Sequence, residues 1–100
     1  MRQGSIAFDL VELPDGVLVR CEGTLNDATS VRLLQAIGRL LAIPVPYLCL
    51  DLRDLDSADE TLVYVLEASS AVAAIEGVRL EMIPGPAVLA VIQPPATGAE

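Results

Sequence analysis

The chain has 100 residues, of which 53% are hydrophobic and 20% charged. This balance suits one folded domain and excludes a disordered segment or a membrane span. Fourteen acidic residues against six arginines, with no lysine or histidine, give a net charge of −8, which makes nucleic acid an unfavourable partner. The missing histidine and lysine remove the usual proton shuttle, the commonest zinc ligand and the lysine of a phosphate-binding loop. We therefore expect no enzyme and no cofactor.

The first two predicted elements form a β-hairpin. Residues 5–12 alternate between apolar and polar side chains, and residues 17–22 form a second strand-like run. The Pro-Asp-Gly sequence at 14–16 is typical of the turn that joins such strands. Gly23 is expected to end the second strand.

A first amphipathic helix is predicted after Asn26 and Asp27, because both residue types commonly cap helix N-termini. The helix is expected to end before Pro44. Its apolar residues recur at helical spacing and form one stripe, consisting of Leu33, Leu34, Ile37, Leu40 and Leu41. Three polar residues fall on the opposite side: Arg32, Gln35 and Arg39.

Residues 47–52 form an almost unbroken apolar run that predicts a strand buried on both faces, in the middle of a sheet. Asp59 is expected to cap the next helix, and Asp56 with Ser57 to form a turn. Between this strand and the next helix we expect an acidic loop with five acids in ten residues: Asp51, Asp54, Asp56, Asp59 and Glu60.

The second helix is predicted from about residue 60 to 76, with Gly77 as its stop. One apolar face is formed by Leu62, Leu66, Ser69 and Ala73. A second apolar patch lies nearly opposite at 100° per residue and is formed by Tyr64, Ala68, Ala71 and Ile75. Covering a small sheet requires only one such face, so the second patch is either buried by another helix or left for a partner.

A strand at 78–83, a turn at 84–86 and a short helix at 87–92 complete a predicted single domain, residues 1–92, followed by a flexible tail, 93–100. The order of elements predicts an α/β sandwich: a mixed, mostly parallel sheet of four to five strands with helices packed on one face. Cys21 and Cys49 lie in apolar runs and are expected to be buried thiols. No signal-peptide pattern opens the chain, so we expect a cytoplasmic protein.

Three motifs follow one another at a characteristic spacing. Residues 23–30 contain Gly-x-Leu-Asn and then Thr-Ser, residues 50–52 read Leu-Asp-Leu, Asp59 comes eight residues after Asp51, and Gly77 comes eighteen after Asp59. Together they resemble the STAS domain, the fold of bacterial anti-sigma-factor antagonists, over about residues 5–92. The family has Asp where this chain has Asn26.

One departure from the family falls at its phosphorylation site. There the residue after the motif Asp is a Ser or Thr that a kinase phosphorylates to switch partner binding off, but here it is Glu60, followed by Thr61, with Leu62 in place of the motif Gly. A carboxylate in the first turn of a helix also stabilises the helix. Alternatively, Glu60 mimics part of a phosphoserine, with one negative charge against about 1.5 to 2, and fixes the surface in one binding state.

A second register is open, because Asp56-Ser57-Ala58 also resembles the family motif. It requires three residues to be deleted from the loop and three inserted in the helix, which rotates the helix face by about 300°. In this register Ser57 is the phosphoacceptor.

The acids also permit other interpretations. Asp54-x-Asp56 begins like a calcium loop, but Asp59 stands where that loop needs Gly and Val65 where it needs Glu. A phosphoacceptor Asp51 needs a lysine that the chain lacks, and few aromatic side chains are present to hold a substrate. We expect no metal site here, and we expect these acids to be exposed to solvent.

The resemblance implies a non-enzymatic module that binds an anti-sigma factor or serine-kinase-like protein and so frees a sigma factor. Its expected contact residues are Leu25, Asn26, Ser57, Asp59, Glu60, Thr61 and Tyr64. The alternative is a small STAS subunit of a bacterial lipid or solute transporter, packed on the ATPase subunit without membrane insertion. Whether the chain also forms a homodimer stays open.

Overall fold

The structure is a computed structural model that describes residues 5–43 and 45–92. The elements are, in chain order, β1 (Ile6–Leu13), β2 (Gly16–Leu25), α1 (Asp27–Leu41), β3 (Tyr47–Ala58), α2 (Thr61–Glu76), β4 (Arg79–Ile83) and α3 (Pro86–Ile92). This order is the predicted one. The predicted tail, residues 93–100, lies outside the described residues.

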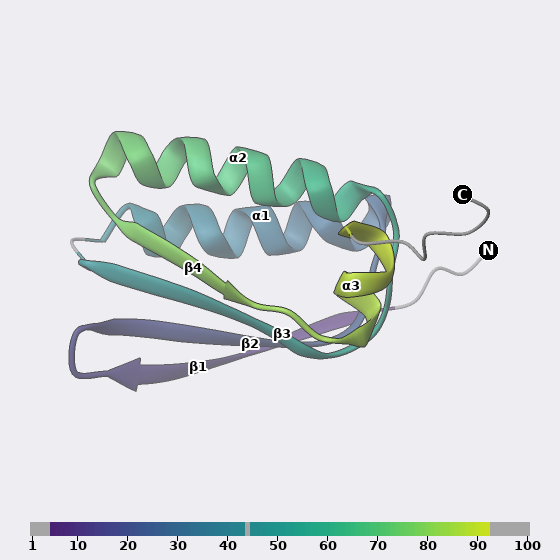
Figure 1. Cartoon of the computed structure of the whole chain (residues 1–100). Helices are drawn as coiled ribbons and strands as arrows, with labels where there is room; N and C mark the ends of the chain where they lie inside the picture. The colour runs from purple at the N-terminus through teal and green to yellow at the C-terminus, as the bar shows by residue number, and fades with distance from the viewer. Residues whose placement is uncertain (1–4, 44, 93–100) are drawn as a thin grey trace, which may run out of the picture.

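The four strands form one mixed sheet in the order β1-β2-β3-β4. The β1–β2 hairpin is antiparallel, whereas β2 with β3 and β3 with β4 pair in parallel. The helices α1 and α2 lie side by side over one face of the sheet, and α3 lies at the end of the sheet where α2 begins (Figure 1). The predicted α/β sandwich is confirmed. None of the described helices is long and apolar enough to cross a bilayer.

The core lies between the sheet and the two long helices. The stripe predicted for α1 is buried except for the half-buried Leu34, and the three polar residues opposite it are exposed. Residues 48–52 of β3 are all buried, as expected for an interior strand. Cys21 and Cys49 are buried and unpaired, as predicted. Burial raises the pKa of Cys21 to about 12, so its thiol stays protonated and unreactive near neutral pH.

Both parallel strands run further than predicted, which corrects two expectations. Gly23 does not end β2, because it lies inside the strand at φ 107°, where the pairing register with β3 shifts, and the strand continues to Leu25. A Cβ at Gly23 would lie 2.2 Å from the Ser5 carbonyl oxygen, so only glycine fits. The expected acidic loop is strand up to Ala58, with no turn at Asp56.

Candidate functional site

Two segments of the chain meet at the carboxyl ends of β2 and β3. Leu25 pairs with Ala58, and the Asp59 backbone N–H donates to the Leu25 carbonyl at 3.1 Å. The Ser57 hydroxyl donates to Thr24 Oγ1 at 3.3 Å. These contacts bring together residues that we call the strand-end surface: Asn26, Ser57, Asp59, Glu60 and Thr61.

Asn26 is held by a complete capping box at the start of α1. Its Oδ1 accepts from the N–H groups of Ala28 at 2.9 Å and Thr29 at 3.0 Å. In return, Thr29 Oγ1 accepts from the Asn26 N–H at 2.9 Å and donates to the Thr24 carbonyl at 2.7 Å. Of the two predicted capping residues, Asn26 is the cap and Asp27 is the first helical residue. This side of the surface is therefore fixed by local hydrogen bonds.

The start of α2 is built differently. Glu60 occupies the N-cap position, but its side chain makes no capping hydrogen bond. Asp59 acts from one residue earlier: its Oδ1 accepts from the Thr61 N–H at 2.9 Å and from the Thr61 hydroxyl at 2.5 Å. Asp59 therefore makes the predicted hydrogen bond to the first turn of α2, but the N-cap position itself is occupied by Glu60. The Glu60 carboxylate is left exposed at the start of the helix.

The strand-end surface is open to solvent. Ser57, Asp59 and Glu60 are exposed, whereas Asn26 and Thr61 are half-buried. No described residue covers this end of α2 sufficiently to bury its carboxylates. The surface is accordingly polar and negatively charged, and it lies at the carboxyl ends of β2 and β3 beside the amino end of α2.

The structure places the other two predicted contact residues in opposite surroundings. Leu25 is fully buried in the core, so the prediction that it contacts a partner is wrong. The cause is the longer β2, in which Leu25 falls on the same inward side as the buried Cys21. Tyr64, on the first turns of α2, is 64% exposed. Leu62, which stands in place of the motif Gly, is a buried core residue.

Asp51 is not part of an acidic surface. It is fully buried on β3, and its two oxygens accept from Nε and Nη2 of Arg53 at 2.9 Å each. Arg20 Nε lies 3.6 Å away. The hydrogen bonds from Arg53 lower the pKa of Asp51 to about 2. Sequence reasoning missed this cluster, although Arg53 stands two residues on and therefore on the same strand face.

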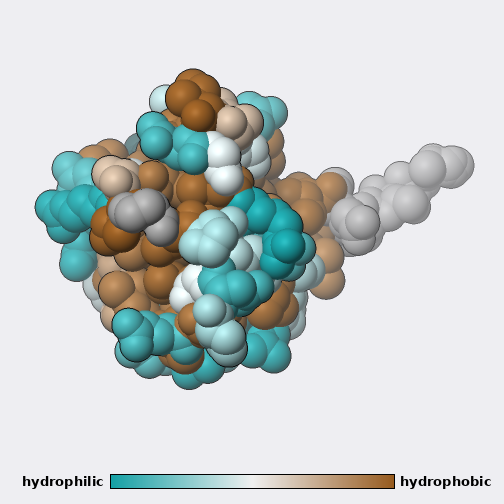
Figure 2. Space-filling model, turned by 90° about the vertical axis from the view of Figure 1, so that its left-hand side faces the viewer, coloured by the Kyte–Doolittle hydropathy of each residue, from teal (hydrophilic) through white to brown (hydrophobic). Residues whose placement is uncertain are grey.

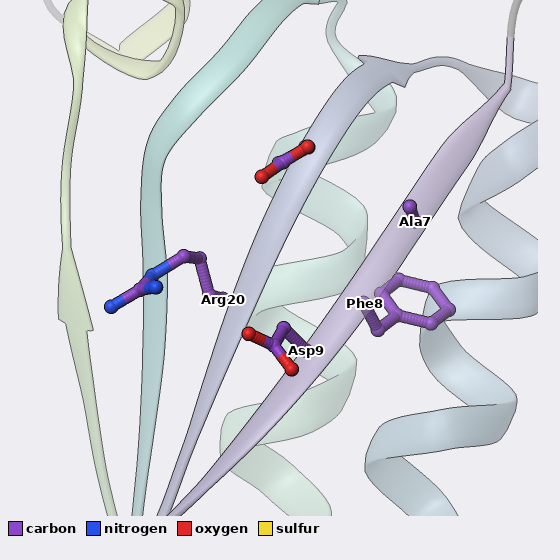
Figure 3. Close-up of a pocket in the computed structure, with 5 residues that line it drawn as sticks. Ala7, Phe8, Asp9 and Arg20 are labelled. Carbon is purple, nitrogen blue, oxygen red and sulfur yellow. The ribbon is translucent and has the colours of Figure 1, made fainter.

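A shallow hollow of about 240 Å³ lies on the sheet face away from the helices, where Arg20 extends across β3 and Asp9 lies near it (Figure 3). Glu22 also lines it. Its charged side chains are the two carboxylates of Asp9 and Glu22 and the guanidinium of Arg20. Within residues 5–43 and 45–92, no three His, Cys, Asp or Glu side chains gather as a metal-ligand set.

Comparison with known proteins shows the fold. No family model and no curated protein matches the chain. Solved structures do match. An anti-sigma factor antagonist from Mycobacterium paratuberculosis is 24% identical, with TM-score 0.72, over 82% of this chain and 70% of that one. A STAS domain of an antisigma-factor antagonist from Rhodobacter sphaeroides is 17% identical, with TM-score 0.62, over 78% and 85%. The anti-sigma factor antagonist SpoIIAA in its unphosphorylated form is 22% identical, with TM-score 0.64, over 87% and 78%. The chain has the STAS fold, as the resemblance implies.

Proposed function

We propose that the protein is a non-enzymatic regulator that binds an anti-sigma factor through the strand-end surface and the neighbouring Tyr64. Binding is competitive: a sequestered anti-sigma factor cannot hold its sigma factor, which is then free to direct transcription. The proposal is supported by the shared fold of the anti-sigma factor antagonists and by an exposed surface at the amino end of α2.

The observation that carries the proposal is the junction of two segments distant in sequence. The Asn26 turn and the Asp59–Thr61 turn are fixed relative to each other by the hydrogen bond from Asp59 to Leu25 and by the side-chain contact of Ser57 with Thr24. A preorganised surface loses little conformational entropy when it binds. Tyr64 adds an exposed aromatic side chain, the type enriched at protein interfaces.

Glu60 gives this surface a permanent negative charge at the position that the family phosphorylates. A carboxylate accepts no phosphate, so binding through this surface is set by the amount of protein and partner and not by a kinase acting at residue 60. The Glu60 side chain makes no capping hydrogen bond, so it is available to pair with a basic group on the partner.

The binding test compares single variants in affinity capture from cells of the source organism, followed by measurement of the dissociation constant for the captured anti-sigma factor. Tyr64→Asp is expected to weaken binding at least about tenfold, the effect of losing a buried aromatic contact. Glu60→Ser is expected to change the affinity in the same assay. The matched control is Glu12→Ser, an exposed acid at the far end of the hairpin. Unchanged affinity in both Tyr64→Asp and Glu60→Ser would refute the proposal.

Phosphorylation provides a separate test of the motif register. The Thr61 hydroxyl is engaged by Asp59, whereas the Ser57 hydroxyl is exposed and makes a longer hydrogen bond, so Ser57 is the more accessible acceptor of the two. We expect no phosphate on the wild-type chain after incubation with the cognate kinase, and phosphate at residue 60 in Glu60→Ser. Phosphopeptide mapping that places phosphate on Ser57 would establish the other register.

The alternative function, a transporter subunit that contacts an ATPase subunit, is favoured by the same absence of an acceptor at residue 60, since such a subunit needs no phosphorylation switch. The capture experiment separates the two functions. Recovery of an anti-sigma factor supports the regulator, and recovery of an ATPase subunit with its permease supports the transporter.

A further inference from the structure

The first strand, β1, leaves one of its two edges unpaired. It is the outermost strand of the sheet, and its eight residues pair with β2 without a register shift (Figure 1). Natural sheets usually protect such an edge by a proline, a lysine, a bulge or a very short strand. Residues 6–13 contain no proline or lysine and no bulge. Among the described residues, no strand pairs with this edge.

The free backbone groups along this edge belong to every second residue of β1. The Thr24 N–H donates to the Ser5 carbonyl at 2.8 Å. In an antiparallel pair, residues that are hydrogen-bonded across the pair alternate with residues that are not. The N–H and C=O groups of Phe8, Leu10 and Glu12 therefore point away from β2, towards the open edge. An extended segment placed alongside β1 has hydrogen-bonding groups for all three residues.

Leu10 is an apolar side chain that this edge leaves in solvent. Phe8 and Leu10 lie on the same face of β1, the face that the helices cover. Phe8 is half-buried and packs against the core, whereas Leu10 is 57% exposed. A strand added beside β1 covers Leu10 and removes apolar surface from water.

The charges beside the edge fit a second copy of the chain. The arginines of α1, Arg32 and Arg39, are exposed and lie about 140° or more around the helix from Leu34, which faces α2. Since α1 packs over β2 and α2 over β4, these arginines are on the side of α1 that faces the β1 edge. Glu12 is an exposed acid on β1. Within the described part of the chain, neither these arginines nor Glu12 form an ion pair.

An antiparallel pairing of β1 with its own copy, centred on Leu10, avoids opposing acids. Leu10 then faces Leu10 of the second copy, Phe8 faces Glu12, and Asp9 faces Val11. The outward-pointing backbone groups of the two strands meet in this register. A pairing centred on Asp9 instead sets two carboxylates directly opposite each other, which is destabilising.

The register centred on Leu10 also brings Glu12 of one copy to the level of Arg32 of the other. In each copy β1 and α1 begin at the same end of the sheet and run in the same direction, because both are antiparallel to β2. Phe8 lies about 7 Å from the start of β1, and Arg32 about 7.5 Å from the start of α1. The second copy's Glu12 faces Phe8 and is therefore level with Arg32. Opposite charges meet at two symmetric places.

We propose that the chain forms a two-fold symmetric dimer by pairing its β1 edges, which joins the two sheets into one. The helices of both copies then lie on the same face of the joined sheet. Because α2 packs over β4, at the opposite side of the sheet from β1, the apolar side chains over α2 at the top of Figure 2 stay exposed in the dimer. The dimer does not depend on the function proposed above. Each copy carries a net charge of −8, so we expect the dimer to be weak.

Sedimentation velocity of the full chain between about 10 µM and 1 mM, at about 0.15 M salt, measures the association. We expect the dimer fraction to rise over this range. Leu10→Pro removes the N–H at the open edge and leaves the hydrogen bonds to β2 in place, so it should weaken the dimer at least about tenfold. Leu10→Lys should also weaken it, whereas Ile75→Lys, at an exposed apolar residue far from the edge, should not.

A charge exchange tests the register. Glu12→Arg and Arg32→Glu should each weaken the dimer at least about threefold, and the double variant should return to within about twofold of the wild type. Glu67→Arg, on α2, is the matched control, because it changes the net charge by the same amount as Glu12→Arg and should not weaken the dimer.

A chain that stays monomeric up to about 1 mM would overturn the proposal. A folded Leu10→Pro variant that dimerises like the wild type would overturn it too, as would a double charge variant that does not recover association.

Discussion

The two long helices lie side by side on the same sheet, yet they differ in the composition of their exposed sides and in how their N-termini are capped. In α1 one apolar stripe is buried, the opposite side is polar apart from the exposed Val31, and a capping box closes the N-terminus. In α2 the buried side is matched by a second apolar side in solvent, and the N-cap residue Glu60 makes no capping bond. Folding stability explains the buried stripe and the capped N-terminus of α1. It leaves the exposed face and the first turn of α2 unexplained, and these are the parts that we assign to binding.

The largest expected effect is the difference in unfolding free energy between truncating a buried residue of α1 and truncating an exposed residue of α2. Leu33→Ala removes a side chain that is 1% exposed and should lower the free energy of unfolding by about 2–5 kcal/mol. Ile75→Ala, at 81% exposure, should change it by no more than about 0.5 kcal/mol. Urea denaturation measures both. A loss above about 1 kcal/mol in Ile75→Ala would mean that the exposed face of α2 is covered in solution.

The helix α1 packs over β2 and α2 over β4, and β3 joins these two strands in the sheet, so a loss of β3 stability should affect both helices. The pKa of Asp51 is lowered from 3.8 to about 2 in the folded chain. Between these values the unfolded chain binds more protons than the folded chain, so the free energy of unfolding decreases as the pH is lowered. The contribution is complete above about pH 4 and lost towards pH 2. We expect it to be roughly 1–2 kcal/mol, because exposed Arg53 is partly screened by solvent.

The measurement for Asp51 is denaturation of the wild type and Asp51→Asn between pH 6 and pH 2, in steps of about half a unit. The stability difference between the two chains should shrink as the pH falls below about 4. A difference that stays constant over that range would show that Asp51 is not held as a carboxylate by Arg53.

A smaller difference in unfolding free energy is expected between substitutions at the N-termini of the two helices. Asn26→Ala removes two accepted hydrogen bonds and should cost about 1 kcal/mol of unfolding free energy. Glu60→Ala removes no capping bond and only a favourable charge near the helix dipole, which is worth about 0.3–1 kcal/mol at an exposed site. Thermal unfolding of both variants measures the contrast. An equal or larger loss in Glu60→Ala would place Glu60 among the stabilising residues and weaken its assignment to binding.

The smallest expected effect concerns Gly38, in the last turn of α1. Gly38→Ala adds a methyl group where no atom lies within 4 Å, and replacing a helical glycine by alanine stabilises by at most about 0.5–1 kcal/mol. Urea denaturation measures the change. A loss of stability in Gly38→Ala would show that the space beside Gly38 is filled in solution.

Periodicity and capping residues are enough to predict the element order, the mixed sheet, the buried stripe of α1 and both apolar sides of α2. The lengths of β2 and β3 are not predictable from local sequence. Gly23 and the acids after residue 51 are typical of loops, and only the pairing between the two strands extends them to Leu25 and Ala58. Leu25 is expected at the surface only from the family resemblance, and the longer β2 buries it. The ion pair between Arg20 and Asp51 likewise depends on two strands that are neighbours only in the folded chain.

The central claim is that the amino end of α2, together with the Asn26 turn, is where a partner binds. Amide chemical shifts of the labelled chain, recorded during titration with the captured anti-sigma factor, test it directly. The account predicts that the largest changes lie at Asn26, Asp59, Glu60 and Thr61. Changes confined to the outer sheet face, around Asp9 and Glu22, would contradict it.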